Sequence, residues 1–127
     1  MKKVKIVDAH HHFWNLSENY YPWLQDTEEK QFFLGDYTEL KKDYLPQDYL
    51  KDASDYDVLA TVHVEAEWDR NDQVGETEWL QRINKTFGMP NAIVGHVWLS
   101  ADNCEEILYK HRQFELFRGV RSKPETA

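Results

Sequence analysis

Four short runs rich in branched aliphatic residues alternate with segments that carry helix signals, and this alternation constrains the fold more than any other feature. Residues 4–8, 58–66, 92–99 and 116–121 have the length and composition of buried strands. Helices are predicted over about 46–55, 73–87 and 102–113. Because strands that alternate with helices build βαβ units, the pattern predicts an α/β protein with a parallel sheet of about four strands.

The predicted helices have recognisable ends. Pro46 suits a first helical turn, where its missing N–H removes no hydrogen bond. Asp72 is a candidate N-cap for the second helix, and Gly88 is placed to end it. Ser100 or Asp102 is expected to cap the third. The apolar residues of the second helix fall on one face, as a core-facing helix requires: Trp79, Leu80, Ile83 and Phe87.

A long connection, at about 13–45, follows the first strand and has no steady period. Connections of this length inside a compact domain are usually functional or disordered. Two interpretations stay open for its many aromatic side chains: the wall of a pocket, or a satellite hydrophobic cluster beneath the connection. The aromatic residues are Trp14, Tyr20, Tyr21, Trp23, Phe32, Phe33 and Tyr37.

Length and composition favour one modest hydrophobic core, so residues 1–127 are expected to form a single domain. A full eight-fold (β/α) barrel takes about 250 residues. Four strands in half that length predict half of a TIM barrel. The net charge of −8 argues against a nucleic-acid partner, although a local arginine would still allow an anionic substrate.

The predicted location is cytoplasmic. A single cysteine, Cys104, excludes an internal disulfide and fits a reducing compartment, and we expect it to be a packing residue. No apolar run approaches the roughly 18 residues of a membrane span. The first residues turn acidic too soon for a signal peptide.

The first strand runs into three histidines, His10, His11 and His12. If the chain stays extended past Asp8, then Asp8, His10 and His12 share one face, and two imidazoles there can reach one divalent cation. Functional residues of parallel α/β proteins gather at the carboxyl ends of strands, and a catalytic zinc site takes about three protein ligands. We therefore predict His10 and His12 as metal ligands, while His11 points the other way and is structural.

Carboxylates and imidazoles also lie in or after the second and third strands. Glu65 is a candidate further ligand, a partner of a ligating histidine, or a contact to substrate hydroxyls. Glu67 is expected to be a solvated strand end. His63 and His96 are interpreted as hydrogen-bonded or packing residues of the core.

Arginine and tryptophan residues are the remaining candidates for substrate contacts. Arg121 lies nearest the carboxyl end of the fourth strand and is the better candidate to hold a substrate carboxylate or carbonyl; a salt bridge on the rim is the alternative. Arg118, three residues earlier, points to the opposite face. Trp14 and Trp68 are candidates for a pocket wall, and equally for the core.

Residues 8–14, DAHHHFW, resemble the opening motif of the amidohydrolase-related, metal-dependent hydrolases of TIM-barrel fold, within the branch of sugar-lactone and dicarboxylate lactonases. The resemblance continues, in the order of the family, through four later blocks: VHVEAEWD (62–69), GETEWL (75–80), IVGHVWLS (93–100) and FRGVRSKP (117–124). It covers essentially the whole chain but only the N-terminal half of the family's barrel.

The resemblance implies that His10 and His12 are the first-strand ligands of a divalent metal, with zinc preferred, although some lactonases of this branch work without a tightly held metal. It also implies that a late His and Asp beyond these residues complete the site. The implied reaction is attack of water on a lactone or amide carbonyl. Decarboxylases and hydratases are built on the same scaffold, so these reactions stay open beside hydrolysis.

Two alternatives stay open. One is a TatD-like nuclease or another phosphoesterase that opens with H-x-H. The other is a non-catalytic or split half-barrel that self-associates or closes with a complementary half, because an open parallel sheet leaves two unpaired edges.

Overall fold

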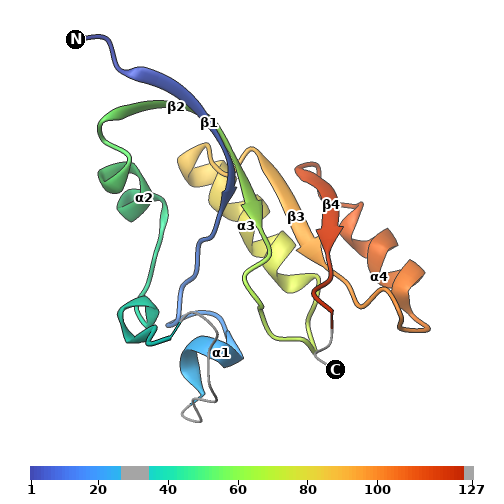
Figure 1. The fold of residues 1–127 in the computed structure, drawn as a ribbon. Helices are drawn as coiled ribbons and strands as arrows, with labels where there is room; N and C mark the ends of the chain where they lie inside the picture. Colours follow the sequence, from blue (N-terminus) through green and yellow to red (C-terminus); the bar gives the residue numbers. More distant parts are fainter. Residues whose placement is uncertain (27–34, 125–127) are drawn as a thin grey trace.

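The computed structural model describes residues 1–26 and 35–124 and confirms the predicted α/β class. The strands β1 (Val4–His11), β2 (Tyr56–Val64), β3 (Ala92–His96) and β4 (Phe117–Arg121) form one parallel sheet in the order β1-β2-β3-β4 (Figure 1). The helices are α1 (Pro22–Gln25), the 3₁₀ turn η1 (Thr38–Leu40), α2 (Pro46–Asp52), α3 (Gly75–Phe87) and α4 (Cys104–His111). α1 and η1 lie inside the long connection, where the sequence predicted no element.

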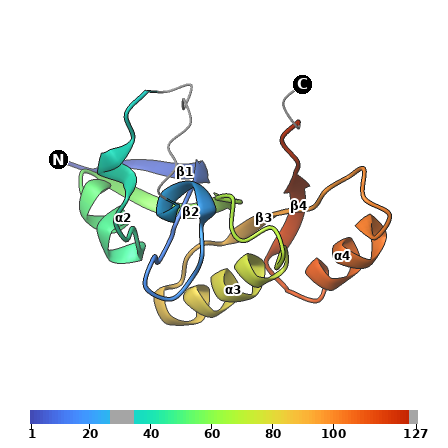
Figure 2. The same ribbon diagram turned by 90° about the horizontal axis from the view of Figure 1, so that it is seen from below.

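The helices α2, α3 and α4 lie on one side of the sheet (Figure 2). Each follows one strand and precedes the next, so the chain advances strand by strand in a single direction. This winding brings the carboxyl ends of all four strands to one edge of the sheet, where parallel α/β proteins carry their sites. Within the described ranges, none of the helices combines the length and apolar character needed to cross a membrane.

The helix ends follow local chemistry. Pro46 occupies the first turn of α2, and Gly88 ends α3 with a left-handed φ of 72°, as predicted. Val74, and not the predicted Asp72, is the N-cap of α3, which begins at Gly75; the Asp72 carbonyl accepts the Gly75 N–H at 3.1 Å in the turn before the helix. The Asp72 carboxylate fills the space beside Gly75, where an added Cβ would come within 2.0 Å of it. Asn103, rather than Ser100 or Asp102, is the N-cap of α4.

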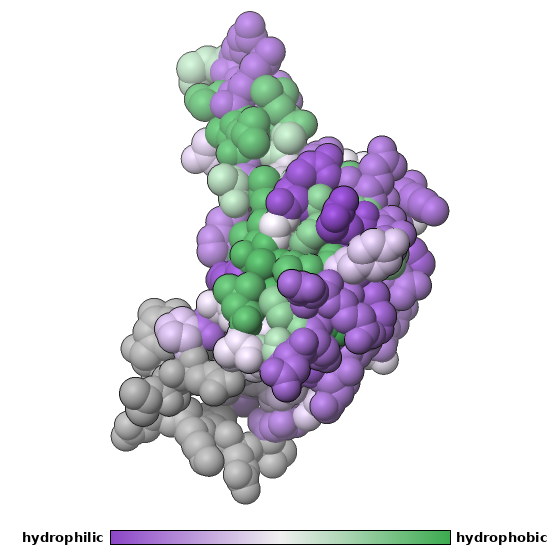
Figure 3. Space-filling view, turned by 90° about the vertical axis from the view of Figure 1, so that its right-hand side faces the viewer, coloured by the Kyte–Doolittle hydropathy of each residue, from purple (hydrophilic) through white to green (hydrophobic). Residues whose placement is uncertain are grey.

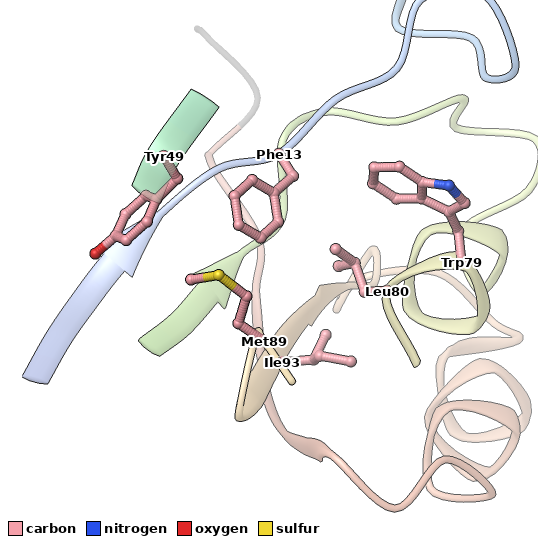
Figure 4. Close-up of a cluster of buried hydrophobic side chains, with 6 residues drawn as sticks. All are labelled: Phe13, Tyr49, Trp79, Leu80, Met89 and Ile93. Carbon is pink, nitrogen blue, oxygen red and sulfur yellow. The ribbon is translucent and has the colours of Figure 1, made fainter. Parts of the chain in front are cut away.

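The main core lies between the sheet and helices α2 and α3 (Figure 4). Aromatic and aliphatic side chains from the strand ends and from both helices interdigitate there, and burying them supplies the main driving force for folding. Its buried members are Phe13, Tyr49, Trp79, Leu80, Met89 and Ile93.

The aromatic connection forms a second, smaller cluster around Trp14, Tyr21, Leu24 and Ala66. Tyr21 is 0% exposed, and the main chain of Trp14 pairs with Tyr44 across the connection. For these residues the satellite-cluster interpretation is confirmed. The predicted contribution of Phe32 and Phe33 lies outside the described residues.

The sheet has edges without a neighbouring strand. Within the described ranges, β1 pairs with β2 and β4 pairs with β3, each on one side. Val7 of β1 and Leu59 of β2 are 61% and 56% exposed. Hydrophobic side chains continue from the projecting end of the molecule along one side of the body, while hydrophilic ones cover the other side (Figure 3).

Candidate active site

The end of β1 contains an irregularity that decides which side chains share a face. Asp8 pairs with Thr61 and His11 pairs with His63, so the strand register shifts between them. The Tyr49 hydroxyl donates to Asp8 Oδ2 at 2.7 Å, and the ring of His11 lies 5.1 Å from the ring of Tyr49. Asp8 and His11 therefore both face α2. The prediction that Asp8 shares a face with His10 and His12 is wrong, because a bulge reverses the strict alternation of an ideal strand.

His10 and His12 remain neighbours despite this irregularity. Their ring centroids lie 5.0 Å apart in an edge-on arrangement, with His10 exposed and His12 half-buried. His12 Nδ1 lies 2.7 Å from the carbonyl oxygen of Val64 on β2. A carbonyl only accepts, so Nδ1 carries the proton and donates, which leaves the Nε2 lone pair of His12 free.

The surroundings keep His12 in the form that binds metals. Burial lowers the pKa of His12 below its ordinary value, and the positive charge of Arg121 contributes further. A neutral imidazole whose second nitrogen donates to a carbonyl is the usual arrangement of a metal-ligating histidine. The tautomer and charge of His12 therefore suit a ligand of a divalent cation, while ligation of a metal by His10 and His12 stays a prediction.

A complete metal site is not assembled by the described residues. Within them, no group of three or more His, Cys, Asp or Glu side chains is arranged to hold a metal ion. A catalytic zinc site takes about three protein ligands.

His11 and His63 belong to the core beneath this pair. His63 is 0% exposed, and its Nε2 accepts the Phe13 N–H at 2.8 Å, which fixes the turn from β1 into the connection. Burial lowers the pKa of His63 well below its ordinary value and that of His11 to about 4. Both rings are therefore neutral at pH 7, and their burial agrees with the core positions predicted for them.

Beside the histidines, five ionic side chains form what we call the charge network: Arg121, Glu65, Arg70, Glu67 and Lys123. Arg121 Nε lies 2.9 Å from Glu65 Oε1, and its Nη2 donates to the Glu65 carbonyl at 2.6 Å. Arg70 lies between the two glutamates, 3.2 Å from Glu65 and 3.6 Å from Glu67. Lys123 Nζ ends the network, 3.3 Å from Glu67.

Glu65 is the centre of this network and is 0% exposed. Burial alone would raise its pKa, but the Glu67 N–H and the two guanidinium groups outweigh burial and lower it. Glu65 is thus a buried carboxylate that orients two arginines. Arg121, predicted as a substrate contact, is engaged on Glu65, so the rim salt bridge that was the alternative is present, while any contact of Arg121 with substrate stays a prediction.

Sequence reasoning did not single out Arg70, Lys123 or Glu76. Lys123 and Arg121 join Glu65, Glu67 and Arg70 only because the ends of β2 and β4 meet, and no spacing along the chain signals this. Glu76 lies in the first turn of α3, 2% exposed, and its Oε2 accepts the Ala66 N–H at 3.1 Å. Burial raises the pKa of Glu76 to about 8, with the neighbouring charge of Glu65 also raising it. Glu76 is therefore mostly protonated at pH 7.

The remaining predicted residues are mainly packing residues. Trp14 is 8% exposed and donates from Nε1 to the Lys42 carbonyl at 2.6 Å, within the second cluster. His96 is 2% exposed, its ring against that of Trp98, and burial lowers its pKa to about 4. Arg118 points away from the charge network and donates to the Phe117 carbonyl. A substrate contact through Trp14 stays a prediction.

The chain is an α/β protein whose parallel sheet has imidazoles and a charge network at the carboxyl ends of its strands, the edge at which such folds usually carry their sites. No family model matches the sequence. It is 39% identical over 121 residues to "Uncharacterized protein y4mH" of Sinorhizobium fredii, covering 95% of this chain and 40% of that protein. The chain thus spans well under half the length of this curated relative.

Among solved structures, the chain is similar to "Amidohydrolase 2 from Bifidobacterium longum subsp. infantis", with a TM-score of 0.50 and 17% sequence identity. The match covers 74% of this chain and 33% of that one. The likeness establishes the fold alone: the chain has an amidohydrolase-like α/β architecture.

Proposed function

We propose that this chain supplies the first-strand portion of a metal-assisted hydrolase that acts on a lactone or an amide carbonyl. One observation carries the proposal: the rings of His10 and His12 lie 5.0 Å apart at the carboxyl end of β1, with the tautomer of His12 set by the Val64 carbonyl. The resemblance of residues 8–14 to lactonases supports the lactone as the first substrate to test.

His10 and His12 would hold a divalent cation, with zinc preferred, through the ring nitrogens that make no hydrogen bond. When bound, such a cation lowers the pKa of water and polarises a carbonyl oxygen. Val64 fixes the rotation of the His12 ring, and the half-burial of His12 restricts access of bulk water on one side. Exposed His10 leaves the other side accessible to substrate.

The charge network supports this edge of the sheet. Glu65 fixes Arg121 through both its carboxylate and its carbonyl, and the two bonds together prevent rotation of the guanidinium. Among the described residues, the hydrogen bonds of Arg121 to Glu65 use Nε and Nη2, so Nη1 is the atom we expect to meet a substrate oxygen. The further metal ligands and the general base would come from sequence corresponding to the rest of the longer relatives.

Metal content tests the proposal. Protein purified without chelator should contain zinc, manganese or iron, and the double variant His10→Ala/His12→Ala should lose it. His11→Phe is the matched control: it removes an imidazole from the same tripeptide, and its ring packs at 4.5 Å from Phe13 on the opposite face. Equal metal content in the wild type and the double variant would remove the proposal. Assay of a lactone panel on this chain, and on the longer relative from Sinorhizobium fredii, tests the reaction itself.

A further inference from the structure

An open hollow of about 310 Å³ lies between the carboxyl ends of β3 and β4. Trp98 and Leu99 line it from the residues after β3, and Ser122 and Lys123 from those after β4, together with Ser100 and Pro124. The hollow combines an aromatic ring, two hydroxyl groups and one ammonium group. Ligand sites of this size usually pair such an apolar surface with a few polar groups that fix orientation.

The charges of the adjoining network do not balance. Along the ion pairs, Arg121, Glu65, Arg70, Glu67 and Lys123 alternate in sign, so both ends of the network are cations. Three positive charges therefore face two negative ones, in a protein whose net charge is −8. An excess positive charge at a hollow attracts an anion.

The excess charge is available at the Lys123 end. Lys123 has a single carboxylate partner, Glu67 at 3.3 Å, and its side chain is 47% exposed. Lys ammonium groups donate up to three hydrogen bonds, so a second acceptor can be accommodated. Arg70, by contrast, has two carboxylate partners, and its guanidinium lies 5.4 Å from the Trp98 ring. Arg70 thereby holds the indole in place as one wall of the hollow.

We propose that this hollow binds the carboxylate group of a small organic acid, with Lys123 as its charge partner, the Ser100 and Ser122 hydroxyls as donors, and Trp98 against the apolar part of the ligand. In the hydrolase proposed above, the ligand would be the acid end of the substrate. That link rests on the proposed function, whereas binding of the carboxylate does not.

The experiment compares phenylacetate with phenylacetamide, which differ in charge but present the same ring. Backbone amide shifts of the protein are followed by NMR during titration. Phenylacetate should bind with a millimolar Kd, perturb the amides of residues 98–100 and 122–123, and bind more weakly as salt is raised. Phenylacetamide should bind about tenfold more weakly, since it lacks the charge-assisted hydrogen bond.

Variants of Lys123 test whether this residue is the charge partner of the bound carboxylate. Lys123→Gln should weaken phenylacetate binding about tenfold, and Lys123→Arg should restore it. Lys110→Gln, which removes an exposed lysine paired with Glu106 on α4, is the matched control and should change nothing. Equal affinity for acid and amide, unchanged affinity in Lys123→Gln, or shifts confined to other residues would each overturn the proposal. The His10→Ala/His12→Ala variant should still bind phenylacetate, so failure of the metal site and failure of this hollow are distinguishable.

Discussion

Glu76→Gln should change how the stability of this protein depends on pH. Glu76 is 2% exposed, and burial raises its pKa to about 8 from an ordinary value of 4.5. The folded chain therefore keeps a proton on Glu76 that the unfolded chain releases. For an acid whose pKa is raised on folding, stability is greatest below the unfolded pKa, falls between about pH 4.5 and 8, and levels off above.

The expected magnitude follows from the two pKa values. The stability contributed by one retained proton falls by about 1.4 kcal/mol per pH unit within this window. Between pH 6 and 8 the free energy of unfolding should therefore fall by about 2 kcal/mol, after allowing for partial ionisation of the folded state near pH 8. Glu76→Gln keeps the size of the side chain and an acceptor for the Ala66 N–H, but it has no proton to release, so this decrease should disappear.

Urea unfolding followed by tryptophan fluorescence at pH 6, 7 and 8 measures the effect. The buried histidines, with pKa values lowered to about 4 for His11 and His96, act in the opposite direction, because their neutral folded forms gain stability as pH rises through 6.5. Their contribution is common to both proteins and cancels in the difference. Glu78→Gln is the control: Glu78 lies on the same helix, with its side chain 57% exposed. A wild-type pH slope in Glu76→Gln would refute the reasoning.

Three further predictions concern stability and association. Glu65→Gln should lower the free energy of unfolding by about 2 kcal/mol. This is less than the loss expected at a fully buried ion pair, because the side chains of Arg70 and Arg121 are 26% and 28% exposed. Urea unfolding of this variant, with Glu67→Gln as the comparison, measures the effect. Gly95→Ala should lower the free energy of unfolding by about 1–3 kcal/mol, since the added Cβ would lie 2.7 Å from His111 Cε1. Gly119→Ala should leave it nearly unchanged, because no atom lies within 4 Å of the position of its Cβ. Thermal unfolding of the two variants distinguishes these outcomes. The unpaired edges and exposed Val7 predict self-association or pairing with a complementary half, and sedimentation showing a stable, folded monomer at low concentration would contradict this.

Much of the fold was predictable because its signals are local. The order of strands and helices follows from runs of branched aliphatic residues and from helix-terminating residues such as Gly88, whose positive φ suits glycine. The starts of α3 and α4 were less predictable, because their N-caps, Val74 and Asn103, make no side-chain capping hydrogen bond, which is the contact that a cap residue in the sequence signals.

The candidate site was likewise predictable only in part. The sequence by itself determined that two imidazoles, His10 and His12, follow a strand, since spacing along one strand is a local property. Only the tertiary structure decided that Asp8 turns away from them, that Glu65 is buried between Arg70 and Arg121, and that Glu76 keeps its proton. These features depend on a bulge set by pairing with β2 and on charges brought together from the ends of β2 and β4 and the first turn of α3, and such long-range contacts leave no periodic mark in the sequence.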